Sequence, residues 1–509
     1  MHGNDPPYAR MLLPALAGAA VLLHISIELF AGYGMFRDEL YYIACSKRPA
    51  LGYVDHPPLS VWVLALWRQI AGESQFSIAL LAALFSGAGV WAAGSLTRRL
   101  GGGTTAILSA CLLFLLAPIS LAMGSFWSMN TLDALFWLFA ARAAIDAFDT
   151  GSARHWLLLG ALTGLGCMNK ISMAWFCLGV VAALVSGDAR AQLRTPWPWL
   201  AGGLTLLLFL PFVLWNAAHD FAHLEFIRNA SAMKYGGISR TDFLGGALLI
   251  HNPLAALALL GGLYWTLLGN GRRFRLIGII WLCTLLILLV NGHSKPEYIS
   301  AATGSLFAAG GVWLEQWRMR RSTLWRRGYL AMVCASAILL APFAAPILPV
   351  DTFIALNRAI APPVKNAEGH AMGDLPQFFA DMHGWEEMAD AVSTAYLSLS
   401  YAERDDVVVL AQNYGQAAAL EYYAKRYPLP PVISMHNNYW LWGYPRGIGS
   451  VIVIGGRRED HERACAQVTA LGNHSHPHAM RYESNLTIWH CRGVRIPLTE
   501  IWKREKRYI

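Results

Sequence analysis

The sequence of 509 residues has few charged side chains: Asp, Glu, Lys and Arg make up 14% of it, whereas hydrophobic residues make up 55%. Ordinary globular domains carry roughly 25% charged residues, so this shortage excludes a typical water-soluble protein. The chain also lacks internal repeats and low-complexity tracts. Its net charge of +8 comes largely from short loops between apolar runs, which fits membrane orientation better than nucleic-acid binding.

Cysteine is scarce as well, with 8 residues in the whole chain. Most of them lie in apolar segments, where cysteine behaves as a small hydrophobic residue. Cys465 and Cys491 instead lie in the polar C-terminal part, where an oxidising compartment would permit a disulfide. The sequence leaves open whether these two cysteines pair.

What the chain has in abundance is apolar runs of about 20 residues, the length that crosses a bilayer as a helix. We therefore predict a polytopic α-helical membrane protein of about eleven transmembrane helices, with the first run kept as a helix rather than removed as a signal peptide. The predicted spans are Met11–Tyr33, Ile78–Leu96, Thr104–Met123, Leu132–Ala147, Trp156–Met168, Ser172–Val185, Trp197–Trp215, Phe243–Leu268, Leu276–Val290, Ile299–Trp313 and Tyr329–Leu348. The apolar run Pro58–Ile70 is too short to cross and is expected to be an interfacial or re-entrant helix.

Arg and Lys residues in the short loops set the orientation of the chain. With a cytoplasmic N-terminus, every predicted inside loop is basic, as in Arg98-Arg99 and Arg272-Arg273. The C-terminal part then lies outside the cell's inner membrane. We predict two domains, a transmembrane domain over residues 1–348 and an extracytoplasmic α/β domain over residues 349–509, because strand-like runs at Asp406–Leu410 and Ser450–Ile454 alternate with helical segments.

The same predicted outer face receives most of the unusual polar residues. The first outer loop holds the acid pair Asp38–Glu39, followed by Asp55-His56. Acidic side chains at a membrane boundary cost free energy, so a functional role is their first interpretation. Further along, the outer loops hold these residues: Asp133, Lys170, His251, Lys295, Glu297 and Arg240.

Each of these residues also has a purely structural interpretation. Lys170 and Lys295 can be interfacial lysines whose charged ends reach the headgroups. Asp133 can cap its helix, and Arg240 can meet lipid headgroups. The pair Asp38–Glu39 is harder to explain in this way, because two acids gain nothing from anionic lipid.

An outer-face carboxylate near several cations suits transfer from a membrane-held phosphate ester to a nucleophile. Cations bind the phosphate leaving group and stabilise its charge, while the carboxylate takes a proton from the attacking group. Nucleotides are scarce outside an inner membrane, so the activated donor is expected to be carried by a lipid.

These residues lie in motifs that resemble the bacterial members of the GT-C superfamily, which are related to protein O-mannosyltransferases and the lipid A aminoarabinose transferase. The motifs extend over the whole membrane region, and the C-terminal NYGQAAALEYY resembles the outer domain of the bacterial branch. The motifs are FRDELYY, GYVDHPPL, MNTLDAL, GLGCMNK, LPFVLWN, HNPL and HSKPEYI.

The resemblance implies a hexosyl- or pentosyltransferase that moves a sugar from a polyprenyl-phosphate-sugar donor to an acceptor, with inversion at the sugar carbon. It implies that Asp38 and Asp133 are catalytic, and that the donor phosphate meets three cations, namely Lys170, Lys295 and Arg240. The expected supporting residues are Glu39, Tyr42, Asp55 and His56. The acceptor stays open among lipid, glycan and protein, because the outer repeats of the eukaryotic mannosyltransferases are missing.

No metal site is assigned from the sequence, although a divalent cation stays open because some GT-C enzymes use one. The tract His474-Ser475-His476-Pro477-His478 is interpreted as solvated surface. Two other functions were weighed. A flippase or transporter of lipid-linked saccharides would place polar residues at mid-membrane and usually contains repeats. A ligase or polymerase of such saccharides would favour a large arginine-rich outer loop.

Overall fold

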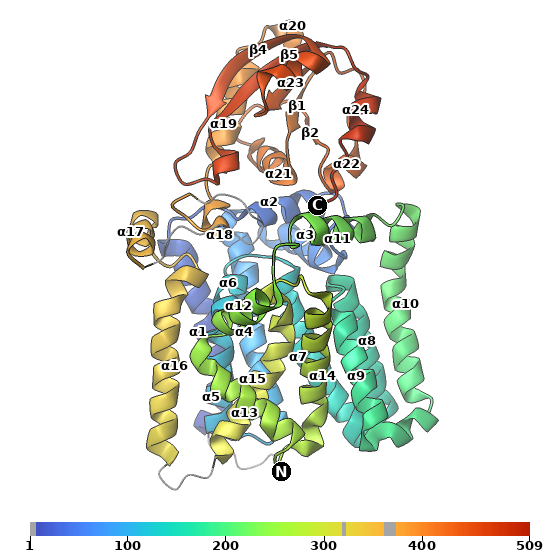
Figure 1. The fold of residues 1–509 in the computed structure, drawn as a ribbon, viewed down its shortest axis with the longest axis vertical. Coiled ribbons are helices and arrows are strands. Elements are labelled where there is room, and N and C mark those ends of the chain that lie inside the picture. The colour runs from blue at the N-terminus through green and yellow to red at the C-terminus, as the bar shows by residue number, and fades with distance from the viewer. Residues whose placement is uncertain (1–6, 318–321, 361–372) are drawn as a thin grey trace.

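The structure is a computed structural model that describes residues 7–317, 322–360 and 373–509. A bundle of helices forms one end of the molecule, and a small domain with a five-stranded sheet sits on the other end (Figure 1). The bundle comprises α1 (Pro7–Phe30), α4 (Gln75–Arg99), α5 (Thr104–Leu115), α6 (Pro118–Gly124), α7 (Met129–Thr150), α8 (Ala153–Asn169), α9 (Met173–Ser186), α10 (Trp197–Ala218), α12 (Arg240–Ile250), α13 (Ala256–Leu267), α14 (Arg275–Asn291), α15 (Ser300–Gln316) and α16 (Ser322–Ala344). Short 3-10 turns join some of them: η1 (Asp188–Arg194), η2 (Pro253–Ala255), η3 (Arg272–Phe274) and η4 (Pro296–Ile299).

A helix or a bent pair of helices lies at each of the predicted spans. Within the described residues, 5 helices are long and apolar enough to cross a bilayer, and up to 7 if each bent pair counts as one span. The chain is therefore a multi-pass helical membrane protein, whereas the count of eleven spans stays a prediction.

Two predicted spans are not straight. The expected span Thr104–Met123 is α5 followed by α6 with a 68° bend, because Pro118 has no N–H and begins a new helix. The expected span Phe243–Leu268 turns by 90° between α12 and α13. Here Asn252 has a φ of +69° and its side chain accepts a hydrogen bond from the N–H of Leu254, so the backbone reverses just before Pro253.

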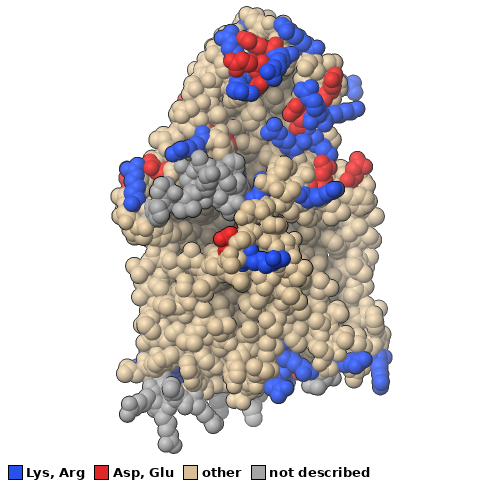
Figure 2. All heavy atoms as spheres, in the orientation of Figure 1, with Lys and Arg blue, Asp and Glu red and all other residues tan. Residues whose placement is uncertain are grey.

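The outward surface of the bundle is apolar. Leu206 is 71% exposed, Val290 is 71% exposed and Leu339 is 74% exposed, which would be unfavourable in water and is expected against lipid tails. Figure 2 shows few charges over the middle of the bundle, and Lys and Arg side chains along its end farthest from the sheet domain. This distribution agrees with the orientation predicted from the basic loops, which itself stays a prediction.

The sheet domain contains α18 (Gln377–Ala380), α19 (Trp385–Leu397), α20 (Tyr401–Arg404), β1 (Val407–Ala411), α21 (Tyr414–Tyr423), β2 (Val432–Ser434), α22 (Asn438–Trp442), β3 (Ser450–Ile454), α23 (Arg458–Ala464), β4 (Cys465–His474), η5 (Arg481–Glu483), β5 (Leu486–Val494) and α24 (Leu498–Arg504). The strand order is β2-β1-β3-β5-β4, with β2, β1 and β3 parallel and β3, β5 and β4 antiparallel. The two strands expected from the sequence are β1 and β3, and α21 follows β1 as predicted.

Cys465 and Cys491 are joined by a disulfide between the neighbouring strands β4 and β5, with a Cα–Cα distance of 5.7 Å. The sequence had left this pairing open. The crosslink ties the two antiparallel strands together, and it is consistent with an oxidising environment around the sheet domain.

Short helices lie between the bundle and the sheet domain, namely α2 (Arg37–Ser46), α3 (Leu59–Ala71), α11 (Ala222–Met233) and α17 (Val350–Ile360) (Figure 1). The short helix expected at Pro58–Ile70 is α3. Buried residues of α2, such as Leu40 and Ile43, share one apolar core with Val409 and Leu420 of the sheet domain. The predicted boundary after residue 348 is thus a change in composition across which the core is continuous, and the division into domains stays a prediction.

Candidate functional site

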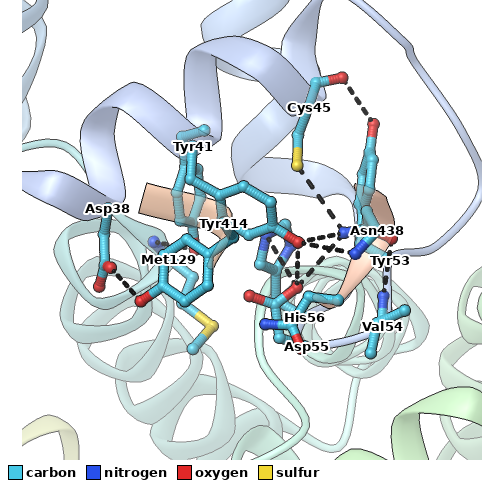
Figure 3. Close-up of polar contacts among 12 residues, drawn as sticks. Asp38, Tyr41, Cys45, Tyr53, Val54, Asp55, His56, Met129, Tyr414 and Asn438 are labelled. Atoms are coloured by element: carbon cyan, nitrogen blue, oxygen red, sulfur yellow. Dashed lines mark hydrogen bonds and ion pairs between the residues drawn. The ribbon is translucent and has the colours of Figure 1, made fainter. Parts of the chain in front are cut away.

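Asp38 lies in the first turn of α2, facing the sheet domain. Its Oδ1 accepts a hydrogen bond of 2.8 Å from the hydroxyl of Tyr414, at the start of α21 (Figure 3). The Asp38 side chain keeps 38% of its surface exposed, so a second group can still reach the carboxylate. The nearest charged neighbour is Arg37, whose Nε is 3.7 Å from Oδ1.

Arg37 fixes α2 against the sheet domain. Its guanidinium donates to the hydroxyl of Tyr482 at 2.9 Å, is 3.4 Å from the buried carboxylate of Asp381, and lies over the ring of Tyr414. A Cβ at Gly415 would come within 2.6 Å of the Arg37 side chain, so a glycine at this position lets the two helices approach closely. These contacts hold the Asp38 backbone in place.

Glu39, the second acid of the pair, is buried and serves the backbone. Its carboxylate accepts hydrogen bonds from the N–H of Phe36 at 3.2 Å and from the N–H of Trp127 at 2.9 Å. The first bond belongs to a capping box at the start of α2. Burial raises the pKa of Glu39 to about 8, although both hydrogen bonds oppose that shift. Glu39 therefore joins the start of α2 to the segment before α7, and its supporting role stays a prediction.

Asp55 belongs to a second polar network beside Asp38. It accepts a hydrogen bond of 3.0 Å from the hydroxyl of Tyr41, and the amide of Asn438 lies 3.4 Å away (Figure 3). Burial raises the pKa of the Asp55 carboxyl, while His56 and the Tyr41 hydroxyl act in the opposite direction. His56 is 2% exposed and stacks on the ring of Tyr42, with ring centroids 4.6 Å apart.

Tyr42 connects this loop to the bundle. Its hydroxyl accepts a hydrogen bond of 3.2 Å from the N–H of Met129, the first residue of α7. The carbonyl of Met129 in turn accepts a hydrogen bond of 2.8 Å from the amide of Asn169, which is fully buried. The N-cap of α7 is Ser128, so Asp133, the residue suggested from the sequence, does not cap this helix.

Asp133 and Lys170 form a pair beneath this connection. Lys170 Nζ lies 3.5 Å from Asp133 Oδ2 and donates a hydrogen bond of 2.7 Å to Asn130 Oδ1. Asp133 also accepts hydrogen bonds from Trp137 at 3.1 Å and from Ser172 at 3.2 Å. The acid is therefore held on several sides inside the bundle.

Asp133 and Lys170 line a cavity of about 690 Å³ between the helices. The rest of its polar lining includes Asn130, His251 and Glu297. Several apolar and aromatic side chains complete the wall: Phe85, Phe114, Ile119, Met123 and Phe307. The cavity thus combines a lysine and two carboxylates with apolar walls, whereas Asp38 is outside its lining.

The other two predicted cations lie apart from this wall. Lys295 Nζ is 3.6 Å from Glu297, which does line the cavity, and 4.8 Å from the centre of the Tyr235 ring. Arg240 begins α12 and donates to the backbone oxygen of Leu289 at 2.8 Å. The phosphate-binding roles of Lys295 and Arg240 stay predictions.

Over the described ranges 7–317, 322–360 and 373–509, no three His, Cys, Asp or Glu side chains gather in a way that could hold a metal ion. The histidine tract is less solvated than expected. His474 is 2% exposed, and the rings of His476 and His478 pack against His383 at centroid distances of 5.7 and 5.6 Å. The burial follows from their position, because the tract continues from β4 into the packing beside α19.

Several residues of the site were not named from the sequence. Tyr414 and Asn438 belong to the sheet domain, and their contacts with Asp38 and Asp55 depend on the fold rather than on any local pattern. Arg37 stands within the FRDELYY motif beside the acids, so its charge was a usable signal.

Comparison with known proteins relates the chain to membrane glycosyltransferases. The family described as dolichyl-phosphate-mannose-protein mannosyltransferase matches residues 55–215. A Pseudomonas aeruginosa undecaprenyl phosphate-alpha-4-amino-4-deoxy-L-arabinose arabinosyl transferase is 32% identical over 232 residues, 40% of this chain and 42% of the relative. A Pseudomonas fluorescens protein of the same description is 28% identical over 175 residues, 32% of this chain and 30% of the relative. The chain thus matches less than half the length of these two curated relatives.

The fold is also similar to that of a solved structure. The crystal structure of ArnT from Cupriavidus metallidurans bound to undecaprenyl phosphate aligns with a TM-score of 0.61. The alignment covers 94% of this chain and 97% of that chain at 12% sequence identity. At this identity the likeness shows a shared fold, from the membrane bundle through to the sheet domain.

Proposed function

We propose that this chain is a glycosyltransferase of the cell inner membrane. The premise is that it is a GT-C protein related to the protein mannosyltransferases and the aminoarabinose transferases. It takes a sugar from a polyprenyl-phosphate-sugar donor and moves it to an acceptor on the outer face. The proposal includes a cytoplasmic N-terminus, an extracytoplasmic sheet domain, and inversion at the sugar carbon.

The observation that carries the proposal is the composition of the large cavity. A polyprenyl phosphate has an anionic head and an apolar chain, and the cavity offers Lys170 together with an aromatic wall that includes Phe114 and Phe307. An ammonium group held inside a bundle binds phosphate strongly, because the surrounding medium screens little. Asp133 and Asn130 hold Lys170 in position for this contact.

Asp38 is proposed as the general base. The acceptor's hydroxyl or amine attacks the first carbon of the sugar, and its proton passes to the Asp38 carboxylate. The bond from that carbon to the phosphate oxygen breaks, so the sugar becomes attached to the acceptor and polyprenyl phosphate leaves with the electron pair. Lys170 stabilises the charge that develops on the leaving phosphate. The partial exposure of Asp38 supports this role, because the acceptor must reach the carboxylate.

The donor sugar is proposed to be a pentose or a hexose carried on a polyprenyl phosphate such as undecaprenyl phosphate. The curated relatives carry the name of a 4-amino-4-deoxy-L-arabinose donor, which makes that sugar the first one to test. The acceptor is proposed to be a component of the cell envelope, either a glycolipid, a polysaccharide or a protein.

The test compares envelopes from cells with and without the gene by mass spectrometry. We expect one glycolipid, glycan or protein of the deletion strain to lack a single sugar residue, and we expect the parent gene to restore it. Membranes of the deletion strain should then accept label from a labelled undecaprenyl-phosphate-sugar when the purified full chain is added. Identical envelopes, together with no transfer from any lipid-linked donor, would contradict the proposal.

A further inference from the structure

A second cavity of about 470 Å³ adjoins the first one at the end of α1 nearest the sheet domain. Gly124, at the end of α6, lines both cavities. Glu39, the neighbour of Asp38 in the chain, also lines the second cavity. Its remaining polar side chains are His24, Glu28, Tyr33, Gln75 and Ser125.

Two polar groups of this lining have no protein partner. Over the described residues, His24 Nε2 and the Tyr33 hydroxyl make no hydrogen bond, although His24 is 2% exposed and Tyr33 is 8% exposed. Buried polar atoms in native proteins nearly always have a partner, so an unpaired atom needs an explanation. The other ring nitrogen of His24 faces the hydroxyl of Ser125 at 3.5 Å, which leaves Nε2 for a bound molecule.

The charge of the second cavity differs from that of the first. Glu28 and Glu39 contribute two carboxyl groups, and no Lys or Arg occurs among its described lining residues. A phosphate or carboxylate ligand would meet no cation here and would lie beside two carboxyl groups. Carboxyl, imidazole and phenol groups instead exchange hydrogen bonds with hydroxyl and amine groups.

We propose that the second cavity is a subsite for a sugar ring that bears hydroxyl or amine groups and no anionic group. His24 and Glu28 are its main polar contacts, and Tyr33 adds a hydroxyl. This inference rests on the proposed glycosyl transfer, because that reaction brings sugar rings to the protein. The bound ring belongs either to the lipid-linked donor or to the acceptor.

Direct binding of monosaccharides tests the subsite without requiring turnover. The probes are methyl glucoside, methyl glucosaminide and glucuronate. Their binding to the full chain in nanodiscs is measured by saturation-transfer NMR. We expect the two sugars without an anionic group to bind at least about tenfold more tightly than glucuronate, because the carboxylate of glucuronate would lose its hydration in a cavity that offers it no cation. Glucuronate binding as well as the other two would overturn the proposal.

Variants locate the binding. His24→Leu is expected to weaken binding of both uncharged and amine sugars about tenfold. Glu28→Gln keeps the shape of the side chain and is expected to remove any preference for the amine sugar. The matched control is Ser26→Ala, because the Ser26 hydroxyl bonds to the carbonyl of Leu22 in its own helix. Parent-like binding in both His24→Leu and Glu28→Gln would overturn the proposal.

Two lipids identify the source of the ring. The affinities of undecaprenyl phosphate and of undecaprenyl-phosphate-4-amino-4-deoxy-L-arabinose are measured for the parent and for Glu28→Gln. Weaker binding of the sugar-bearing lipid alone assigns the donor's ring, whereas equal binding of both lipids, with monosaccharide binding reduced, assigns the acceptor's ring. If no sugar is ever transferred but the monosaccharide results hold, the subsite stands and the proposed function fails.

Discussion

The hydroxyl of Tyr414 donates a hydrogen bond of 2.8 Å to Asp38, across a sequence separation of 376 residues. One partner lies in the first turn of α2 and the other begins a helix of the sheet domain. The sheet domain therefore completes the surroundings of the proposed base rather than merely covering the bundle.

Replacing Tyr414 with Phe removes this donor while keeping the ring beside Arg37. This bond fixes the orientation of the Asp38 carboxylate, so we expect kcat to fall about tenfold or more in Tyr414→Phe because the base is then less well positioned. Binding of the bare polyprenyl phosphate should not change. The control is Tyr427→Phe, whose hydroxyl instead contacts Glu386. A parent-like kcat in Tyr414→Phe would remove the bond from the mechanism.

Replacing Lys170 with Ala removes the ammonium group from the large cavity. We expect the affinity for undecaprenyl phosphate to fall about tenfold to 100-fold, because the phosphate loses a charge-assisted contact. The measurement is lipid binding to the full chain in nanodiscs. Lys425→Ala serves as the control, since that side chain is 70% exposed and pairs with Glu73 away from the cavity. Unchanged affinity in Lys170→Ala would place the phosphate elsewhere.

The buried carboxyl of Glu39 predicts a pH dependence of stability. Its pKa rises from 4.5 to about 8 on folding, so between these values the folded chain holds a proton that the unfolded chain has lost. Stability should be fully present below the unfolded pKa and should fall as pH rises toward 8, by up to about 1.4 kcal/mol per pH unit. In Glu39→Gln this part of the fall should disappear in thermal unfolding between about pH 5 and about pH 8. An unaltered pH slope would show that Glu39 titrates as an ordinary acid.

The disulfide between Cys465 and Cys491 should stabilise the sheet domain. It closes a loop with a sequence separation of 26 residues. Loop-closure entropy then suggests that the double substitution with Ala lowers the free energy of unfolding by about 3 kcal/mol. Unfolding of the sheet domain can be followed by hydrogen exchange of the backbone amides of β4 and β5, the two strands that the disulfide joins. Equal stability with and without the crosslink would contradict this expectation.

Much of the fold follows from local patterns. Apolar runs locate the helices of the bundle, and β-branched runs locate β1 and β3. The bend at Asn252-Pro253 was harder to predict from the sequence, because a proline within an apolar run indicates either a kink or a reversal of the chain. Only the packing decides between them: the Asn252 amide donates to the carbonyl of Val333 on α16.

The candidate site was predictable only in its membrane half. Asp133 and Lys170 stand in the motifs MNTLDAL and GLGCMNK, and the fold brings the carboxylate and the ammonium group to 3.5 Å. Tyr414 stands in the NYGQAAALEYY motif, whereas Asn438 stands in none of the motifs, and only the docking of the sheet domain on α2 brings these two residues to the acids. The contact of Arg240 with the backbone oxygen of Leu289 likewise depends on the fold, because no local pattern indicates it.

The proposed transfer depends most directly on Asp38, and the deciding measurement is the rate of sugar transfer by Asp38→Asn. The purified full chain in nanodiscs receives labelled undecaprenyl-phosphate-sugar and envelope acceptor from cells that lack the gene. We predict that the parent transfers label, and that Asp38→Asn binds the donor with parent affinity but transfers at least about a thousandfold more slowly, within the range expected for loss of a general base. Transfer by Asp38→Asn at the parent rate would contradict the account.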